Sequence, residues 1–248
     1  MDKIQVYLAK WDDPAWYAQV ACEVTRAANK YSSPSELLEH IESHKWDNNK
    51  VNKMLNLPHS KISRFTDFTF IITGTSRRFL AQLMTHHVGI SIMSGSLQYS
   101  DHSKQHLDEM FVVPNALLKE PLHIQLDYLD AQEACFKQYE LMRSLGIDND
   151  TVGYTMPQSL RNILLVKVNL EELKFIGNQR LCKRNTDETR YVVAKMVQEV
   201  VNKTGIDDSL FAPTCSKQVC SEGIYSCGKP VFTFDVTDYL AKEFPLLK

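Results

Sequence analysis

The fold is decided by the stretch Phe65-Thr66-Asp67-Phe68-Thr69-Phe70-Ile71-Ile72-Thr73. Phe68, Phe70 and Ile72 alternate with Thr69, Ile71 and Thr73, and this period of two predicts a strand that is buried on at least one face. Gly74 is expected to end the strand. Thr75-Ser76 then supplies the cap of a helix running through Phe79, Leu80, Leu83 and Met84, which brings His86 and His87 to the C-terminal end of that helix.

The residues on either side of this stretch predict further strands and helices. Ile4 to Leu8 alternates like a strand, and Asp13-Pro14 then opens an amphipathic helix from about Trp16 to Ala28. Ser33-Pro34-Ser35-Glu36 begins a second helix. Leu97 to Ser100 and Met110 to Val113 are expected to form short strands.

The second half of the chain predicts mostly helices. They are expected at Leu126 to Leu145, Pro157 to Val166, Leu170 to about Gly177, and Asp187 to Asn202. Val231 to Val236 is expected to be a late strand. The fold class is therefore α+β, with a mixed sheet and a helical second half. The sequence has no Gly-x-Gly-x-x-Gly turn, no Gly-Lys-Ser/Thr phosphate loop and no Gly-x-Ser-x-Gly elbow.

The composition predicts a single domain over residues 1–248 with a C-terminal cysteine-rich loop at 213–230. The 248 residues are 44% hydrophobic and 23% charged, which is enough to bury a core without help from a metal. The formal net charge of -2 gives no long-range attraction to nucleic acid or anionic membranes, so a local cluster of donors has to hold any anionic ligand. Since no apolar run approaches membrane-spanning length and no signal segment opens the chain, we expect a cytoplasmic protein.

Four of the six cysteines have the spacing of a metal site. Cys182 follows Gln179-Arg180-Leu181, whereas Cys215, Cys220 and Cys227 lie in the C-terminal loop with Cys-x4-Cys-x6-Cys spacing. Four thiolates can close a tetrahedral shell, which predicts a structural zinc site or, as the alternative, an iron-sulfur cluster. A set of unrelated free cysteines is the plainer interpretation, and disulfides are disfavoured in a reducing cytosol.

The order of several motifs resembles the flavin-dependent thymidylate synthases, and in particular a cysteine-bearing subgroup of that family. These motifs are a histidine turn at His59, the Phe-Thr-Phe strand, the helix holding Gln82, the His86-His87 turn and Ser-x-Gln-Tyr-Ser at 96–100. Further along, the family order continues in Met156-Pro157, Val168-Asn169-Leu170, Gln179-Arg180-Leu181-Cys182-Lys183-Arg184 and the cysteine-bearing tail. The resemblance spans roughly His59 to Gly228, and only the cysteine set and the Arg180 segment are specific on their own.

The resemblance implies the fold of this family and C5 methylation of dUMP or a close uridine nucleotide. It implies FAD as cofactor, methylenetetrahydrofolate and NADPH as co-substrates, and a homotetramer with FAD between subunits. Arg180 is implied to face the pyrimidine and to stabilise negative charge on the ring, a task suited to a guanidinium. The implied flavin ligands are His59, His86, His87, Asn169 and Arg184. The implied nucleotide contacts are Gln82, Ser96, Gln98, Tyr99 and Arg180.

The sequence departs from this family at positions that carry charge. Thr85-His86-His87 stands in place of Arg-His-Arg, Gln98 in place of the arginine of Arg-Tyr-Ser, and Gly153 in place of a further arginine. Because each charge-assisted contact contributes about 1.5 to 3 kcal/mol, losing two arginines weakens a phosphate site by a few kcal/mol. Either Arg77, Arg78 and Arg161 compensate, or the ligand is not ordinary dUMP. Two alternatives stay open: a diverged homologue that binds a flavin or pyrimidine nucleotide without making dTMP, and an enzyme that adds a different one-carbon group.

The singled-out residues also have ordinary structural explanations. His86-His87 at a helix end suits the helix dipole, and His59 after Leu57-Pro58 suits a surface turn. Arg180 and Arg184 are four residues apart and could form an exposed basic face satisfied by Glu188. The basic pair Lys183-Arg184 is too short to indicate nucleic-acid binding.

Overall fold

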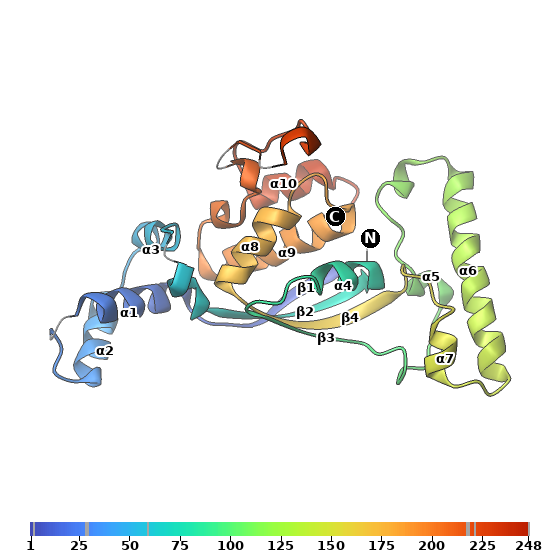
Figure 1. Cartoon of the computed structure of the whole chain (residues 1–248), viewed down its shortest axis with the longest axis horizontal. Coiled ribbons are helices and arrows are strands. Elements are labelled where there is room, and N and C mark those ends of the chain that lie inside the picture. The colour runs from blue at the N-terminus through green and yellow to red at the C-terminus, as the bar shows by residue number, and fades with distance from the viewer. Residues whose placement is uncertain (2, 28–29, 59, 217–218, 221, 248) are drawn as a thin grey trace.

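The molecule is built on a four-stranded sheet covered by helices on one face. The computed structural model describes residues 1, 3–27, 30–58, 60–216, 219–220 and 222–247, so His59 lies outside the described residues. The strands are β1 (Gln5–Trp11), β2 (Asp67–Ser76), β3 (Ile90–Ser94) and β4 (Arg161–Asn169), in the order β1-β2-β4-β3. Helices α8 (Leu170–Arg180), α9 (Asp187–Thr204) and α10 (Val236–Glu243) lie over one face (Figure 1). The α+β prediction is confirmed.

Every strand pair in the sheet is antiparallel, so the predicted mixed sheet is wrong in this respect. The predicted central strand is confirmed as β2, whose Phe68, Phe70 and Ile72 are fully buried. They pack in the main core with α9, which contributes Val192, Val193, Met196, Val197 and Val200. The hydrophobic effect of this one buried face positions α8 and α9 over the sheet.

Gly74 does not end β2, because the strand runs on to Ser76 through a register shift between Thr73 and Thr75. Gly74 has φ +75°, and a Cβ at this position would lie 2.4 Å from the Lys3 carbonyl oxygen. The glycine therefore makes a bulge rather than a stop. The Ser76 hydroxyl then accepts a hydrogen bond from Phe79 N at 3.0 Å and caps α4 (Arg77–Leu83), as predicted.

Four other predicted elements are wrong. At the strand expected over 110–113, Met110 ends the short helix α5 (Leu107–Met110) and Phe111 forms an isolated bridge to Leu160. The helix expected at 157–166 is largely strand β4, and the strand expected at 97–100 is a turn, while β3 was not predicted. Residues 231–235 form no strand, because Asp235 caps α10 and the Val236 amide donates to Asp208 Oδ2 at 2.7 Å. The remaining helices largely follow the sequence, with α1 at Pro14–Arg26, α2 at Pro34–Ser43 and α6 at Leu122–Ser144.

Two helical arms extend from opposite ends of the sheet (Figure 1). One holds α1, α2, α3 (Asn48–Leu55) and the 3-10 turn η1 (Ser60–Arg64), and the other holds α5 (Leu107–Met110), η2 (Leu117–Lys119), α6 and α7 (Asn149–Gly153). The second arm has its own small core of Met110, Phe111, Phe136, Tyr139, Val152 and Leu160. The short turns η3 (Asp208–Phe211), η4 (Thr214–Ser216) and η5 (Gly223–Tyr225) lead to α10. Among the described residues, no helix combines the length and apolar character needed to cross a membrane.

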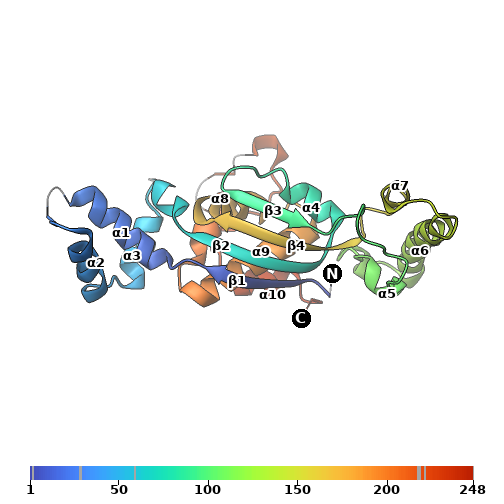
Figure 2. The same cartoon turned by 90° about the horizontal axis from the view of Figure 1, so that it is seen from below.

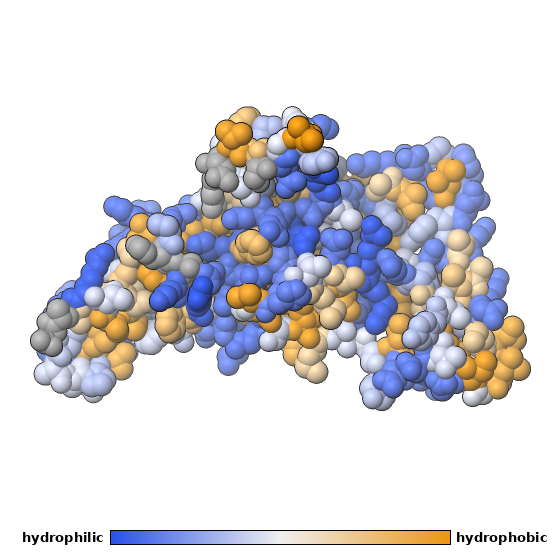
Figure 3. All heavy atoms as spheres, viewed as in Figure 1, coloured by the Kyte–Doolittle hydropathy of each residue, from blue (hydrophilic) through white to orange (hydrophobic). Residues whose placement is uncertain are grey.

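The other face of the sheet carries an apolar row that none of the described helices covers. Tyr7, Ile71, Leu165 and Met93 are register partners across all four strands. They are 61%, 40%, 43% and 71% exposed, respectively. This open face looks toward the viewer in Figure 2, with the helices behind it. The hydropathy surface also shows apolar groups toward the ends of both arms (Figure 3).

Candidate functional site

The candidate site begins where β4 passes into α8. The Asn169 side chain caps α8 by accepting from Glu172 N at 2.9 Å, and its backbone amide donates to Gly89 O at 2.8 Å. Gly89 has φ +71°, and a Cβ there would lie 2.3 Å from Asn169 Nδ2. The tight contact therefore requires glycine and holds the segment after His87 against the start of α8.

A chain of three side chains, the buried His86 and Glu172 and the half-buried Arg180, links α8 to the turn after α4. His86 Nδ1 and Glu172 Oε1 are 2.8 Å apart, and Arg180 Nε donates to His86 Nε2 at 3.0 Å. His86 and Glu172 are only 6% and 7% exposed. Glu172 follows the helix cap by three residues and Arg180 lies two turns further on, so both point to the same side of α8.

Burial favours the neutral forms of both titratable groups beside Arg180. It lowers the pKa of His86 from 6.5 to about 4, with smaller contributions from the positive Arg180 and from His87. It also raises the pKa of Glu172 from 4.5 to about 7, with a smaller contribution from Glu171. The guanidinium thus remains the permanent charge of the group.

Three further residues hold the end of the Arg180 side chain. Its Nη2 donates to Thr85 Oγ1 at 2.6 Å and to the Gln82 backbone oxygen at 3.5 Å, and its Nη1 donates to Asn185 Oδ1 at 3.4 Å. Asn185 is itself held by the carbonyl oxygen of Gln179, to which its Nδ2 donates at 2.8 Å. Arg180 is therefore fixed by groups from α4, from the turn after α4 and from the turn after α8.

Arg180 stands between two cavities. The smaller, about 320 Å³, is lined by Thr85, His86, His87, Val88, Glu172, Phe175, Gln179 and Arg180. The larger, about 470 Å³, adds the turn at 182–185 and the C-terminal loop, and it carries the cations Lys183, Arg184 and Lys229. A cationic cavity with a fixed guanidinium in its wall suits a planar ligand that carries an anionic group.

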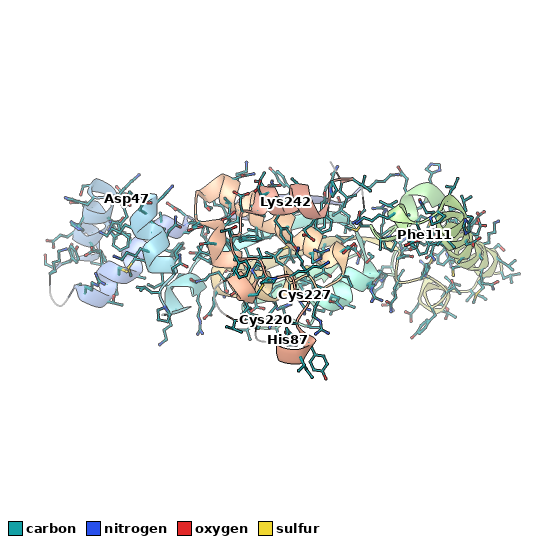
Figure 4. The ribbon with its side chains drawn as sticks, turned by 90° about the horizontal axis from the view of Figure 1, so that it is seen from above. Asp47, His87, Phe111, Cys220, Cys227 and Lys242 are labelled. Atoms are coloured by element: carbon teal, nitrogen blue, oxygen red, sulfur yellow. The ribbon has the colours of Figure 1, made fainter. Side chains whose placement is uncertain are left out.

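The larger cavity also collects all four cysteines of the predicted metal site, Cys182, Cys215, Cys220 and Cys227. Lys229 N donates to Cys227 Sγ at 3.4 Å and Val231 N donates to Cys215 Sγ at 3.5 Å. Figure 4 labels Cys220 and Cys227 in this loop. Within the described residues, however, no three His, Cys, Asp or Glu side chains are grouped closely enough to hold a metal ion.

Arg184 contacts the C-terminal loop. Its Nη1 donates to the Tyr225 backbone oxygen, its guanidinium lies 5.6 Å from the centre of the Tyr225 ring, and Glu222 Oε2 is 3.7 Å away. Glu188 does not satisfy this arginine, because its carboxylate accepts hydrogen bonds from Ser76 N and Ser76 Oγ. The interpretation of Arg180 and Arg184 as one basic face paired to Glu188 is therefore wrong.

The structure does not bring the other predicted nucleotide contacts to Arg180. Ser96 Oγ accepts from the backbone amides of Gln98 at 3.1 Å and Tyr99 at 3.4 Å, which makes this segment a turn. The neighbouring Gly95 and Ser100 line a separate cavity of about 410 Å³ together with Arg77 and Arg161. Arg78 lines a fourth cavity of about 570 Å³. Of the predicted substrate residues, only Gln82 contacts Arg180, and it does so through its backbone.

Glu172 and Asn185 belong to the site but were not predicted. Asn169 followed by glutamate three residues later is a helix-start signal, and the sequence could have revealed Glu172 through it. No local pattern marks Asn185, because its role depends on a turn that folds back onto α8.

Comparison with known proteins gives consistent matches. The profile of the family Thy1, described as "Thymidylate synthase complementing protein", matches residues 10–204. A "Flavin-dependent thymidylate synthase" from Pyrococcus abyssi is 30% identical over 151 residues, which is 61% of this chain and 61% of that relative. One from Geobacter sulfurreducens is 26% identical over 187 residues, or 72% and 75% of the two chains. The chain thus spans about three fifths of the Pyrococcus relative.

Solved structures share the fold. Thymidylate Synthase X (ThyX) from Helicobacter pylori with FAD and dUMP superposes with a TM-score of 0.65 at 18% identity, covering 84% of this chain and 97% of that one. The UMP/dUMP methylase PolB from Streptomyces cacaoi bound with 5-Br dUMP gives 0.68 at 16% identity, covering 85% and 95%. Since the family profile matches most of the chain, the protein belongs to the Thy1 family of thymidylate synthase complementing proteins.

Proposed function

We propose that the protein methylates C5 of dUMP or a close uridine nucleotide in an FAD-dependent reaction, with methylenetetrahydrofolate and NADPH as co-substrates. The observation that carries this proposal is Arg180, whose guanidinium is fixed by His86, Thr85 and Asn185 in the wall between two cavities. The names of the Pyrococcus and Geobacter relatives and the ligands of the Helicobacter and Streptomyces structures point to the same chemistry.

Arg180 is the catalytic residue of this proposal. C5 of uracil is a weak nucleophile, so its attack on a one-carbon donor requires electron density on the ring and negative charge on the carbonyl oxygens. A preorganised guanidinium beside a carbonyl stabilises that charge without having to reorganise. Bound FAD would supply the electrons that convert the transferred methylene into a methyl group.

The cationic cavity beside Arg180 fits the diphosphate of FAD by the chemistry of its donors. Lys183, Arg184 and Lys229 line it, and the Asn169 cap stands at the start of the same helix α8. His87 is exposed and lines the smaller cavity, where it stands in place of an arginine of the related enzymes. We therefore propose FAD binding through these residues, weaker than in an Arg-His-Arg enzyme.

We propose a homotetramer in which a second copy completes the site. The uncovered row of Tyr7, Ile71, Leu165 and Met93 is an apolar face of the kind that a subunit interface buries. Assembly would also explain why the Ser96 turn and Arg180 line separate cavities within one chain. Met93→Glu should shift the mass measured by light scattering toward smaller species, with Lys10→Glu on the exposed part of β1 as the control. A parent that is monomeric would refute the assembly.

A structural metal is the remaining part of the proposal. Cys182, Cys215, Cys220 and Cys227 line one cavity, and the amides of Lys229 and Val231 donate hydrogen bonds to the sulfurs of Cys227 and Cys215. Zinc is the first candidate and an iron-sulfur cluster the second, in a protein kept reduced in the cytosol. Anaerobically prepared protein should contain about one zinc, or several irons with sulfide, per chain. A metal-free parent whose Cys215→Ser variant melts at the same temperature would refute the site.

A second candidate function is binding of a pyrimidine nucleotide or flavin without formation of dTMP, or transfer of a different one-carbon group. The positions of Thr85, Gln98 and Gly153 favour it, because all three lack the arginine of the related enzymes. Product analysis by mass spectrometry separates these functions when the protein is supplied with FAD, NADPH, methylenetetrahydrofolate and either dUMP or UMP. A product about 14 mass units heavier than the substrate, the difference between a methyl group and a hydrogen, supports methylation. Bound nucleotide without product supports the second function.

A further inference from the structure

We infer that His86 and Glu172 are positioning residues for Arg180, and that His86 is not a flavin ligand. The inference deepens the proposed function, on which its catalytic consequence rests. His86, the histidine retained in the altered Thr85-His86-His87 turn, then orients the arginine that faces the nucleotide. The observation is the chain of hydrogen bonds from Glu172 through the imidazole to Arg180.

The geometry determines where the imidazole proton lies. Arg180 Nε always carries hydrogen, so His86 Nε2 has to accept in their 3.0 Å hydrogen bond. His86 is then neutral with its proton on Nδ1, which donates to Glu172 Oε1 at 2.8 Å. Both ring nitrogens are thus occupied, and the 6% exposed side chain has no donor left for a phosphate or a flavin.

The arrangement orients Arg180 without cancelling its charge. A carboxylate in direct contact with the guanidinium would neutralise it, whereas here the imidazole separates Glu172 from Arg180. The other charged or titratable groups around the trio are His87 and Glu171. Burial lowers the pKa of His86 to about 4 and raises that of Glu172 to about 7, so at neutral pH the arginine keeps its full positive charge beside a neutral ring.

The hydrogen bonds of the guanidinium leave one direction for a ligand. Arginine has five N–H donors. Within the part of the chain that the structure describes, Nε donates to His86 and one donor of Nη1 donates to Asn185. The two donors of Nη2 are directed to Thr85 and to the Gln82 carbonyl. The second donor of Nη1 is available for a pyrimidine carbonyl. Thr85, which stands where related enzymes carry an arginine, accepts one of these hydrogen bonds.

The first test reads the proton positions directly and needs no ligand. Imidazole ¹⁵N NMR of the parent should show His86 as the Nδ1–H tautomer, with no titration between about pH 5.5 and pH 8, and the Arg180 Nε–H signal should be protected from exchange with water. In His86→Phe that Arg180 signal should be lost, while in His86→Gln it should persist because the amide can both accept and donate. An Nε2–H tautomer, or a His86 that titrates near its ordinary pKa, would overturn the inference.

The second test measures function in the FAD-loaded protein. His86→Phe should weaken dUMP binding about 10-fold or more and lower kcat, whereas FAD binding should change by less than about threefold. His86→Gln should restore most of the dUMP affinity, and His123→Phe, an exposed histidine on α6, serves as the control. Loss of FAD affinity with unchanged dUMP affinity would overturn the inference in favour of a flavin ligand. A parent that shows the expected NMR signals but binds no pyrimidine nucleotide would refute the proposed function while leaving the positioning of Arg180 standing.

Discussion

Replacement of Arg190 by methionine should detach α10 from the body of the protein. Arg190 is only 7% exposed, and its guanidinium binds Asp187 Oδ1 at 2.7 Å and Glu243 Oε2 at 2.7 Å. It also lies 5.2 Å from the centre of the Phe244 ring. These contacts join the start of α9 to the end of α10. The ion pairs raise the pKa of Arg190 above its ordinary value, so the side chain stays charged at any accessible pH.

The magnitude follows from what the substitution leaves behind. Breaking a buried ion pair by removing one partner costs about 3–5 kcal/mol because the remaining charge is uncompensated. Here Glu243 retains Lys183 Nζ at 2.8 Å, so we expect the lower end of that range, about 3 kcal/mol. For a chain of this length, such a loss lowers Tm by roughly 6–12 °C.

Calorimetry of Arg190→Met against the parent measures this loss. The control is Lys242→Met, which removes the exposed pair of Lys242 with Asp238 on the same helix and should cost less than about 0.5 kcal/mol. Because the Tyr239 hydroxyl on α10 donates to Leu181 O at 2.9 Å, the loosened helix should also release the turn that carries Arg184 and Asn185. A Tm for Arg190→Met within about 2 °C of the parent would refute this reasoning.

Two further predictions concern α8. In Gly177→Ala the new Cβ would lie 2.6 Å from the Phe211 carbonyl oxygen, so we expect α8 to shift and the free energy of unfolding to fall by about 1–3 kcal/mol in urea titration; an unchanged value would contradict the tight packing. For pH, the folded pKa of His86 (about 4) lies below the unfolded value of 6.5, so its stabilisation is lost as pH falls from 6.5 toward 4, whereas that of Glu172 (about 7, above 4.5) is lost as pH rises through 7. Between about pH 4.5 and 6.5 the pair holds one proton in the folded state and one in the unfolded state, so the two effects cancel in the parent. In Glu172→Gln only the His86 effect remains, so the free energy of unfolding should fall, relative to the parent, by up to about 1.4 kcal/mol for each unit by which the pH is lowered. Equal pH profiles would contradict the assignment.

The sequence predicts the elements whose pattern matches one buried face. β2 alternates cleanly, and α9 has its apolar residues at helical spacing, so both were identified. For β4 the sequence predicts a helix, because the outward positions Ile163 and Leu165 are also apolar and hide the period of two. Leu165 belongs to the apolar row that stays uncovered in the single chain. No local sequence pattern predicts that the outward face of a strand is apolar.

The site was predicted residue by residue but not as an arrangement. Arg180 and His86 were each identified, yet they are 94 residues apart and their hydrogen bond depends on how α8 packs against the turn after α4. The resemblance placed His86 on the flavin, whereas its ring faces Glu172 and Arg180. The cysteines were predicted to converge and do line one cavity, although no metal-binding group forms among the described residues.

Release of tritium from [5-³H]dUMP tests the central claim most directly, because methylation at C5 replaces the hydrogen on that carbon. The protein supplied anaerobically with FAD, NADPH and methylenetetrahydrofolate should release the label into water as dTMP forms. Arg180→Ala should reduce the release by at least about 100-fold, as expected for loss of a charge-stabilising contact in the transition state. A parent that binds FAD and dUMP but leaves the tritium on C5, or an Arg180→Ala variant that releases it at the parent rate, would contradict the account.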